Sequence, residues 1–185
     1  MNQPSHLPIA GADFATPRGP TRSRVAIVSS AWHRDLVDRA RKAALAEFER
    51  SPTPPSQVDL FEVPGAFEIP LHAKRLAESG RYDAIVACGL IVNGGIYRHD
   101  FVASAVIDGL MRVQLDSGVP VLSAVLTPRD FHEHDDHQRF FSEHLVKKGR
   151  EVAHACLETI ASLRGLDEPA SLGTALAGGL SRHLE

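Results

Sequence analysis

The chain has little that would mark it as a nucleic-acid-binding, membrane or disulfide-bonded protein. Its 20 Lys and Arg residues are outnumbered by 23 Asp and Glu residues, and the net charge is −3, whereas nucleic-acid-binding domains usually carry a basic surface. The longest apolar run, 84–92, is too short to span a bilayer. The N-terminus lacks the basic and apolar regions of a secretory signal. Only two cysteines are present, Cys88 and Cys156, both in apolar stretches. We therefore expect buried, reduced thiols in a cytoplasmic protein without nucleic-acid or membrane partners.

Length and composition are those of one globular domain with tails. The chain has 185 residues, of which 43% are apolar, enough for one hydrophobic core. Residues 1–23 are rich in proline and poor in large apolar residues, so we predict a disordered N-terminal arm. The Gly- and Ala-rich residues 165–185 are predicted to be a tail, in which 172–180 could form a short helix. The expected domain is therefore 24–164.

Four short apolar runs alternate with four stretches of helical periodicity. The apolar runs predict strands at 25–28, 58–63, 84–92 and 119–126. Helical spacing recurs within 36–48, 65–78, 102–113 and 145–163, and it places His72, Val102 and Leu163 on the same faces as their apolar neighbours. Apolar strands separated by helices favour a parallel sheet that is covered on both faces. We predict an α/β three-layer sandwich with a four-stranded parallel sheet flanked by helices.

In such folds, ligands bind beyond the carboxyl ends of the strands. Trp32, the only tryptophan, follows the first strand. It is either a packing residue of the core or an interface, or a flat surface on which a planar ring stacks. Glu68 follows the second strand in the first turn of a helix. It either complements the helix dipole or accepts hydrogen bonds from ligand hydroxyls, and the spacing leaves both open.

The segment after the third strand has the features of an anion site. Gly94 and Gly95 precede a helix start, where backbone N–H groups can bind an anion, although no nucleotide-binding motif is present. Arg98 and His99 follow. Arginine cannot act as a base because its guanidinium stays protonated, whereas histidine can near neutral pH. Which of these two side chains faces a substrate is left open by the sequence.

Histidine is abundant, with ten residues, and His132, His134, His137 and His144 lie close together after the fourth strand. Imidazole and carboxylate groups are zinc ligands, but neither an HExxH motif nor paired cysteines occur here. A charged surface at a helix start is the favoured interpretation, and a metal-dependent hydrolase is the minor alternative. We expect neither a metal nor another cofactor.

The residues at the strand ends resemble those of the lumazine synthase family. Pro64 to Pro70, with the sequence Pro-Gly-Ala-Phe-Glu-Ile-Pro, matches the family's second-strand motif without a gap. Gly89 to Val102 aligns with the family's glycine-rich segment, and Val119 to Thr127 aligns with its fourth strand. Trp32 stands where the family has an aromatic residue. The resemblance covers about 24–163, nearly the whole predicted domain.

The resemblance implies a fold, a reaction and an assembly. The fold is the flavodoxin-like sandwich predicted above. The family joins 5-amino-6-(D-ribitylamino)uracil to 3,4-dihydroxy-2-butanone 4-phosphate, and it forms 6,7-dimethyl-8-ribityllumazine, phosphate and water in riboflavin biosynthesis. It is a transferase that uses no metal or organic cofactor. Its subunits form pentamers with active sites between neighbours. The segment 94–100 resembles the second subtype, a decamer of two stacked pentamers, and riboflavin synthase is an implied partner.

Roles follow from the alignment, residue by residue. Trp32 would stack on the pyrimidine, and Ala66, Phe67 and Glu68 would hold the ribityl chain and the ring edge. Main-chain groups of Leu90, Ile91 and Val92 would contact the pyrimidine. Gly94 and Gly95 would lie beside the phosphate. Ser123 and His137 would come from the adjacent subunit, where His137 would also bind phosphate. Arg98 and His99 are the candidate catalytic residues.

Three positions depart from the family pattern. Arg98 aligns with the usual catalytic histidine, His137 with the usual phosphate-binding arginine, and Ser123 with a usual aromatic residue. A neutral imidazole donates one hydrogen bond where arginine donates a charged pair, so His137 should bind phosphate more weakly. These departures motivate an alternative function, an oligomeric protein that binds lumazine or flavin with little turnover.

Overall fold

A four-stranded parallel sheet forms the centre of the computed structural model, which describes residues 23–96, 98–129, 131 and 135–167, with only the backbone described at 135–138. The strands are β1 (Arg24–Ser30), β2 (Gln57–Val63), β3 (Ala84–Leu90) and β4 (Val121–Leu126). Their order in the sheet is β2-β1-β3-β4, and every pair is parallel. The predicted strands are confirmed. β3 ends at Leu90, two residues before the predicted end. All but the last residue of the predicted arm, and most of the predicted tail, lie outside the described residues.

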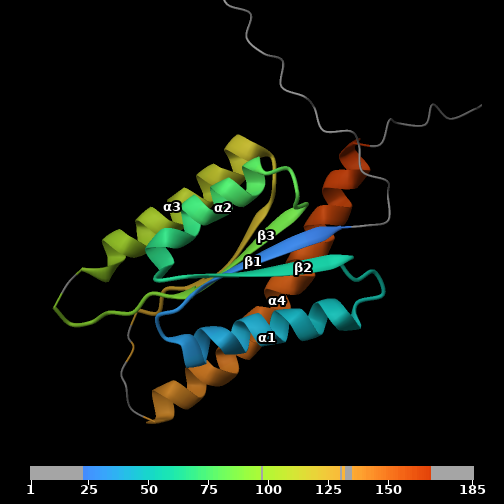
Figure 1. Cartoon of the computed structure of the whole chain (residues 1–185). Coiled ribbons are helices and arrows are strands. Elements are labelled where there is room, and N and C mark those ends of the chain that lie inside the picture. Colours follow the sequence, from blue (N-terminus) through green and yellow to red (C-terminus); the bar gives the residue numbers. More distant parts are fainter. Residues whose placement is uncertain (1–22, 97, 130, 132–134, 168–185) are drawn as a thin grey trace, which may run out of the picture.

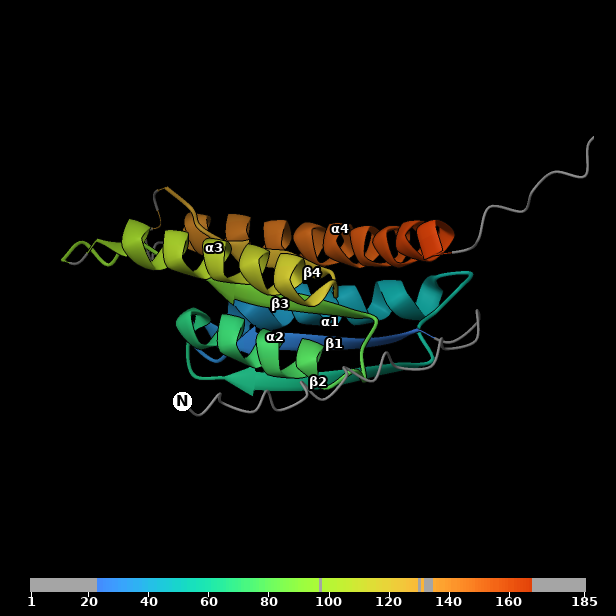
Figure 2. The same ribbon diagram turned by 90° about the horizontal axis from the view of Figure 1, so that it is seen from above.

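Helices cover both faces of this sheet. On one face lie α1 (Arg34–Arg50) and α4 (Asp135–Asp167), and on the other α2 (Ile69–Glu78) and α3 (His99–Ser117) (Figure 1). Figure 2 views the molecule from the side of α2 and α3. A short 3₁₀ helix, η1 (Ala66–Glu68), precedes α2. Right-handed crossovers through helices are how parallel strands are normally joined. The predicted three-layer sandwich is confirmed.

Local sequence explains where the helices begin and end. Val37, Ala40, Ala44 and Phe48 are the buried residues of α1, and this helix ends at Arg50, ahead of three prolines at 52, 54 and 55. Pro70 lies in the first turn of α2, as predicted, where its missing N–H needs no partner. Gly118 follows α3 with a φ of 69°, the left-handed conformation that commonly terminates helices.

The central strands are buried on both faces. All seven residues of β3 and six of the seven of β1 are buried, whereas the edge strands β2 and β4 are partly exposed. Two apolar clusters result, one beneath α1 and α4 and one beneath α2 and α3. Three expectations from helical spacing are wrong: His72, Val102 and Leu163 are exposed. Each lies at the margin of an apolar stripe, where a small rotation of the helix turns a side chain to solvent.

The two cysteines are buried, unpaired thiols, as predicted. Burial in an apolar environment raises the pKa of Cys88 and of Cys156 to about 12, so both stay protonated and unreactive near neutral pH. The helices of the described segments contain none that is both long enough and apolar enough to cross a membrane.

Helices α1 and α4 approach each other closely at Gly149. A methyl group on Gly149 would overlap the carbonyl oxygen of Ala40 and would lie 2.9 Å from its carbonyl carbon and Cα. These atoms belong to the backbone, which cannot swing aside as a side chain can. The absence of a side chain at 149 therefore permits the contact between the two helices.

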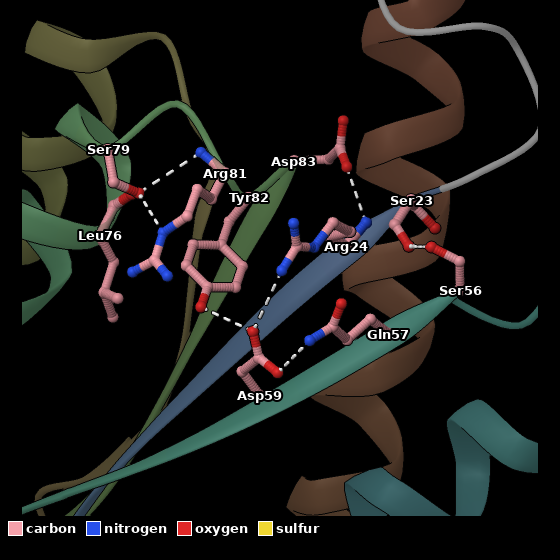
Figure 3. A network of polar contacts seen from close by, with 10 residues as sticks. All are labelled: Ser23, Arg24, Ser56, Gln57, Asp59, Leu76, Ser79, Arg81, Tyr82 and Asp83. Carbon is pink, nitrogen blue, oxygen red and sulfur yellow. Dashed lines mark hydrogen bonds and ion pairs between the residues drawn. The ribbon is translucent and has the colours of Figure 1, made fainter.

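A polar network closes the amino end of the sheet (Figure 3). The Asp59 carboxylate accepts hydrogen bonds from the Tyr82 hydroxyl at 2.7 Å and from Gln57 Nε2 at 2.6 Å, and Arg24 lies 3.5 Å away. The hydrogen bond from Tyr82 is the largest cause that lowers the pKa of Asp59. Asp83 accepts from the Arg24 N–H at 2.7 Å. The network joins β2 to the segments that begin β1 and β3.

Gly149→Ala should destabilise the fold, because the new methyl group must push α1 and α4 apart. We expect a loss of about 2 kcal/mol or more in the free energy of unfolding, measured by urea denaturation. Gly165→Ala is the matched control. It lies on the same helix with open space around it, so alanine should be neutral or stabilise by up to about 1 kcal/mol. Equal effects of the two substitutions would contradict the packing role of Gly149.

Tyr82→Phe should lower the free energy of unfolding by about 1 kcal/mol at pH 7, because a hydrogen bond to a carboxylate is lost. The folded state lowers the pKa of Asp59 below its ordinary value, so this stabilisation is present above about pH 4 and is lost as pH falls through the folded pKa. The difference between wild type and variant should therefore shrink between pH 5 and pH 2. Urea denaturation across this range measures it, and a constant difference would contradict the assignment.

Candidate functional site

The carboxyl ends of all four strands meet at one end of the molecule, on the left in Figure 1. Backbone hydrogen bonds hold the segments that follow the strands. Ala31 N donates to Val63 O at 2.8 Å, and Trp32 N donates to Pro64 O at 3.2 Å. Ile91 N donates to Leu126 O at 2.9 Å. The residues after β1, β2 and β3 are thus brought to one place, as predicted.

Trp32 projects from the turn between β1 and α1, and 70% of its surface is exposed. It is therefore not a core residue of this chain. His33, the next residue, has a φ of 54°, and no other non-glycine residue in the described segments has a positive φ. Its carbonyl accepts the first hydrogen bonds of α1, from Leu36 and Val37. A strained residue at a turn is commonly found where a functional side chain must be held in one direction.

The Trp32 indole lies against the backbone of Gly65. A methyl group on Gly65 would lie 3.4 Å from Cε3 of Trp32 and 2.9 Å from Oε2 of Glu68. Glu68 Oε2 also accepts a hydrogen bond from Gly65 N at 2.8 Å. Glycine is required here because two side chains close over its Cα. One Glu68 oxygen therefore has a local structural role, while Oε1 has no partner among the described residues and can accept from a ligand.

Free backbone donors lie beside this carboxylate. The N–H groups of Ala66 and Phe67 begin η1, and neither donates to another described residue, as is usual for the first donors of a helix. Phe67 is exposed and Ala66 is buried. Two N–H donors and one carboxylate oxygen next to an aromatic ring suit a ligand that has a planar ring and hydroxyl groups.

Residues at the end of β3 present backbone rather than polar side chains. Leu90 and Ile91 are buried and Val92 is half-buried. Because the Ile91 N–H donates to Leu126, a ligand can contact Ile91 through its carbonyl. Of the main-chain contacts predicted for Leu90, Ile91 and Val92, the one from the Ile91 N–H is therefore not available to a ligand.

The glycine pair after β3 is exposed, and its segment extends beyond the end of the sheet (Figures 1 and 2). Gly95 has a φ of 77°, and its N–H donates to Asn93 Oδ1 at 2.9 Å. An anion at Gly95 would therefore replace the Asn93 side chain, whereas no contact within the described segments occupies Gly94.

Arg98 and His99 lie at the start of α3. Arg98 is exposed and His99 is half-buried. The Arg98 guanidinium forms an ion pair with Asp100, with 2.7 Å between Nη2 and Oδ2, and it lies over the Phe101 ring, 4.2 Å from its centroid. The hydrogen bond between the Arg98 and Asp100 side chains raises the pKa of Arg98 and lowers the pKa of Asp100. Arg98 is a permanent cation at this end of the molecule.

Ser123 and His137 are not brought into this group by the described part of the chain. Ser123 lies in the middle of the edge strand β4, three residues before its end, and its Oγ accepts from Val125 N. The backbone of His137 lies in the first turn of α4, but its side chain lies outside the described part. His132 and His134 also lie outside. Among the residues that the structure describes, no group of three or more His, Cys, Asp and Glu could hold a metal ion.

Sequence reasoning missed three features of this site. Asp100 and Phe101 hold the Arg98 guanidinium, and the spacing gave no signal for it, because side chains two residues apart on a helix do not normally face each other. His33 contacts Phe131 with ring centroids 5.7 Å apart, which joins the end of β1 to the segment after β4. The positive φ of His33 had only a weak signal in the sequence, because histidine is among the few non-glycine residues enriched in that conformation.

Comparison with known proteins agrees with this arrangement. The sequence profile of the family described as 6,7-dimethyl-8-ribityllumazine synthase matches residues 22–164. This range contains all of the strands and nearly all of the helices described above.

Individual relatives match over most of their length. A protein of Rhodococcus erythropolis named 6,7-dimethyl-8-ribityllumazine synthase is 62% identical over 77% of this chain and 92% of its own. Two further relatives are named 6,7-dimethyl-8-ribityllumazine synthase 2. The protein of Pseudomonas syringae is 52% identical over 77% of this chain and 84% of its own. The protein of Bradyrhizobium diazoefficiens is 54% identical over 86% of this chain and 95% of its own.

Proposed function

The chain belongs to the 6,7-dimethyl-8-ribityllumazine synthase family, and from this premise we propose which residues carry the reaction. The enzyme is a transferase of riboflavin biosynthesis, which condenses 5-amino-6-(D-ribitylamino)uracil with 3,4-dihydroxy-2-butanone 4-phosphate. Joining an amine to a ketone requires that both be positioned, that protons move, and that the phosphate have a place to leave from. We assign these tasks to the residues at the carboxyl end of the sheet.

The pyrimidine ring stacks on Trp32 in this proposal. The observation that carries it is the exposed indole, which lies against Gly65 beside a carboxylate, one oxygen of which has no partner among the described residues. Glu68 Oε1 accepts from hydroxyls of the ribityl chain, and the N–H groups of Ala66 and Phe67 donate to oxygen atoms. The backbone at Leu90, Ile91 and Val92 contacts the edge of the pyrimidine, with Ile91 contributing its carbonyl.

The phosphate of the second substrate lies at the segment between β3 and α3. Its donors there are the Gly94 N–H, the Arg98 guanidinium and the Gly95 N–H. The last of these becomes available when the Asn93 side chain is displaced. Arg98 stabilises negative charge and donates hydrogen bonds. Proton transfer falls to His99, or to water and substrate groups, because the guanidinium cannot release a proton in this pH range.

Ser123 and His137 serve the site of an adjacent subunit in this proposal. Support comes from large apolar side chains that α2 and α3 leave exposed in the single chain and that a neighbouring subunit could cover; they are Leu71, Phe101, Ile107, Met111 and Leu115. We propose a homopentamer, paired into a decamer as in the second subtype, and riboflavin synthase as a further partner. We also propose the cytoplasm as the compartment, because both cysteines are unpaired.

The two other functions considered from the sequence are less well supported. The names of the relatives do not favour a binding protein with little turnover. The hypothesis of a metal-dependent hydrolase rested on a histidine cluster, of which His132 and His134 lie outside the described residues. Addition of a chelator should leave the synthase activity unchanged, and it therefore separates the two enzymatic hypotheses.

Arg98→Ala should reduce kcat/KM more than His132→Ala, because only Arg98 lies at a family site position. We expect at least about a tenfold loss for Arg98→Ala, the usual effect of removing a charged donor to a developing anion, and little change for His132→Ala. Formation of the lumazine is followed by its absorbance with both substrates present. Equal losses would refute the role of Arg98, and no product above the uncatalysed background would refute the synthase assignment itself.

Trp32→Ala should raise KM for the pyrimidine substrate by about two- to tenfold, because the stacking surface is lost. KM for the butanone phosphate should change less. Trp32→Phe is the matched control, since it keeps a flat ring and should retain most of the affinity. An unchanged KM for the pyrimidine in Trp32→Ala would count against the stacking role.

A further inference from the structure

Two hydrogen bonds to Asp100 and a contact with the Phe101 ring hold the Arg98 guanidinium at the start of α3. Arg98 Nη2 lies 2.7 Å from Asp100 Oδ2, and Arg98 Nε lies 3.4 Å from Asp100 Oδ1, so the carboxylate receives two parallel hydrogen bonds. The guanidinium carbon lies 4.2 Å from the centroid of the Phe101 ring. Both charged side chains are exposed to solvent, so another anion can reach them.

A carboxylate bound in this way occupies the atoms that would bind a phosphate group. Carboxylate and phosphate oxygens are both recognised by two parallel N–H donors of arginine. The Nε and Nη2 edge of Arg98 is taken by Asp100. An incoming dianion must either displace this carboxylate or bind at the remaining edge with the negative charge of Asp100 close by. Either arrangement weakens its binding compared with an unpaired arginine.

Phe101 provides a second, independent support for Arg98. A guanidinium that stacks on an aromatic face is attracted to it without needing a carboxylate. The two supports differ in what they do to an anion, since the ring leaves the hydrogen-bonding edges of the guanidinium open and Asp100 fills one of them. Removal of the Asp100 charge should therefore free the donors while Phe101 keeps the guanidinium near its place.

We propose that Asp100 competes with the substrate's phosphate group for Arg98. It is a positioning residue that limits the affinity of the site for phosphate and so helps the inorganic phosphate product to leave. This inference rests on the proposed function for its assignment of Arg98 to the phosphate end of the site. It adds a residue that the alignment gave no role, and it predicts that an apparently favourable ion pair weakens substrate binding.

Binding of inorganic phosphate to the full-length protein tests the proposal directly. By isothermal titration calorimetry, Asp100→Asn should bind inorganic phosphate about two- to fivefold more tightly than wild type, the range expected for an exposed charged pair. KM for the butanone phosphate should fall by a similar factor, while KM for the pyrimidine stays unchanged. Asp100→Ser serves as a second variant if the asparagine variant does not fold, and Asp100→Glu should restore wild-type affinity.

Two controls separate this effect from a general change in charge. Asp116→Asn breaks an exposed pair with Arg112, 3.3 Å apart on the same helix, and should leave phosphate binding unchanged. In an Arg98→Ala background, Asp100→Asn should no longer tighten phosphate binding, because the guanidinium for which the two anions compete is absent. Equal tightening in both backgrounds would overturn the proposal, and so would unchanged, weaker or unmeasurable phosphate binding in Asp100→Asn.

The binding measurement also separates this proposal from the proposed function. Phosphate affinity is measured without turnover, so a protein that forms no lumazine can still show tighter phosphate binding in Asp100→Asn. In that case the synthase assignment fails and the competition at Arg98 stands. A protein that forms lumazine with the same phosphate affinity in wild type and variant gives the opposite result.

Discussion

Parallel pairing of the four strands is the constraint on which the rest of the structure depends. Parallel neighbours cannot be joined by tight hairpins, so each connection must cross the sheet, and it does so as a helix. The helices cover both faces, which is why β1 and β3 are almost wholly buried. The same constraint sends every strand end to one edge. Trp32 and Glu68 are far apart in the sequence, and both lie against Gly65 because β1 and β2 end side by side.

The two ends of the sheet use polar groups in opposite ways. At the amino end, the Asp59 carboxylate accepts two short hydrogen bonds, from Tyr82 and from Gln57, and forms an ion pair with Arg24. At the carboxyl end, Glu68 satisfies Gly65 with one oxygen and keeps the other free, and the first amides of η1 have no partner among the described residues. Paired groups stabilise a fold, whereas unpaired groups beside an exposed aromatic ring are available to a ligand. The groups around Trp32 are thus available to a ligand, whereas the contacts of Asp59 contribute to stability.

Much of this could be predicted from the sequence, because periodicity and strand-end residues are local signals. Apolar runs gave the four strands, and the 64–70 motif placed Glu68 at the start of a helix. What failed depended on tertiary geometry. Spacing assigned His72 and Val102 to apolar stripes, but the exact rotation of a helix decides which marginal residue faces water. Gly149 looks like any helical residue in the sequence, and only the approach of α1 explains why it lacks a side chain. Likewise, spacing alone cannot show that Asp100 turns back onto Arg98.

The pair of Arg98 and Asp100 also bears on how protons move in the reaction. Arginine is already the most basic side chain, and its hydrogen bond to Asp100 raises its pKa further. Arg98 therefore keeps its charge near neutral pH, and the contribution that we propose for it is electrostatic. A histidine at this position would be able both to accept and to release a proton. With arginine in its place, we propose that the proton steps use His99, which is half-buried at the first residue of α3, or water and substrate groups. Charge stabilisation and proton transfer, which one imidazole can combine, would then be divided between two adjacent residues.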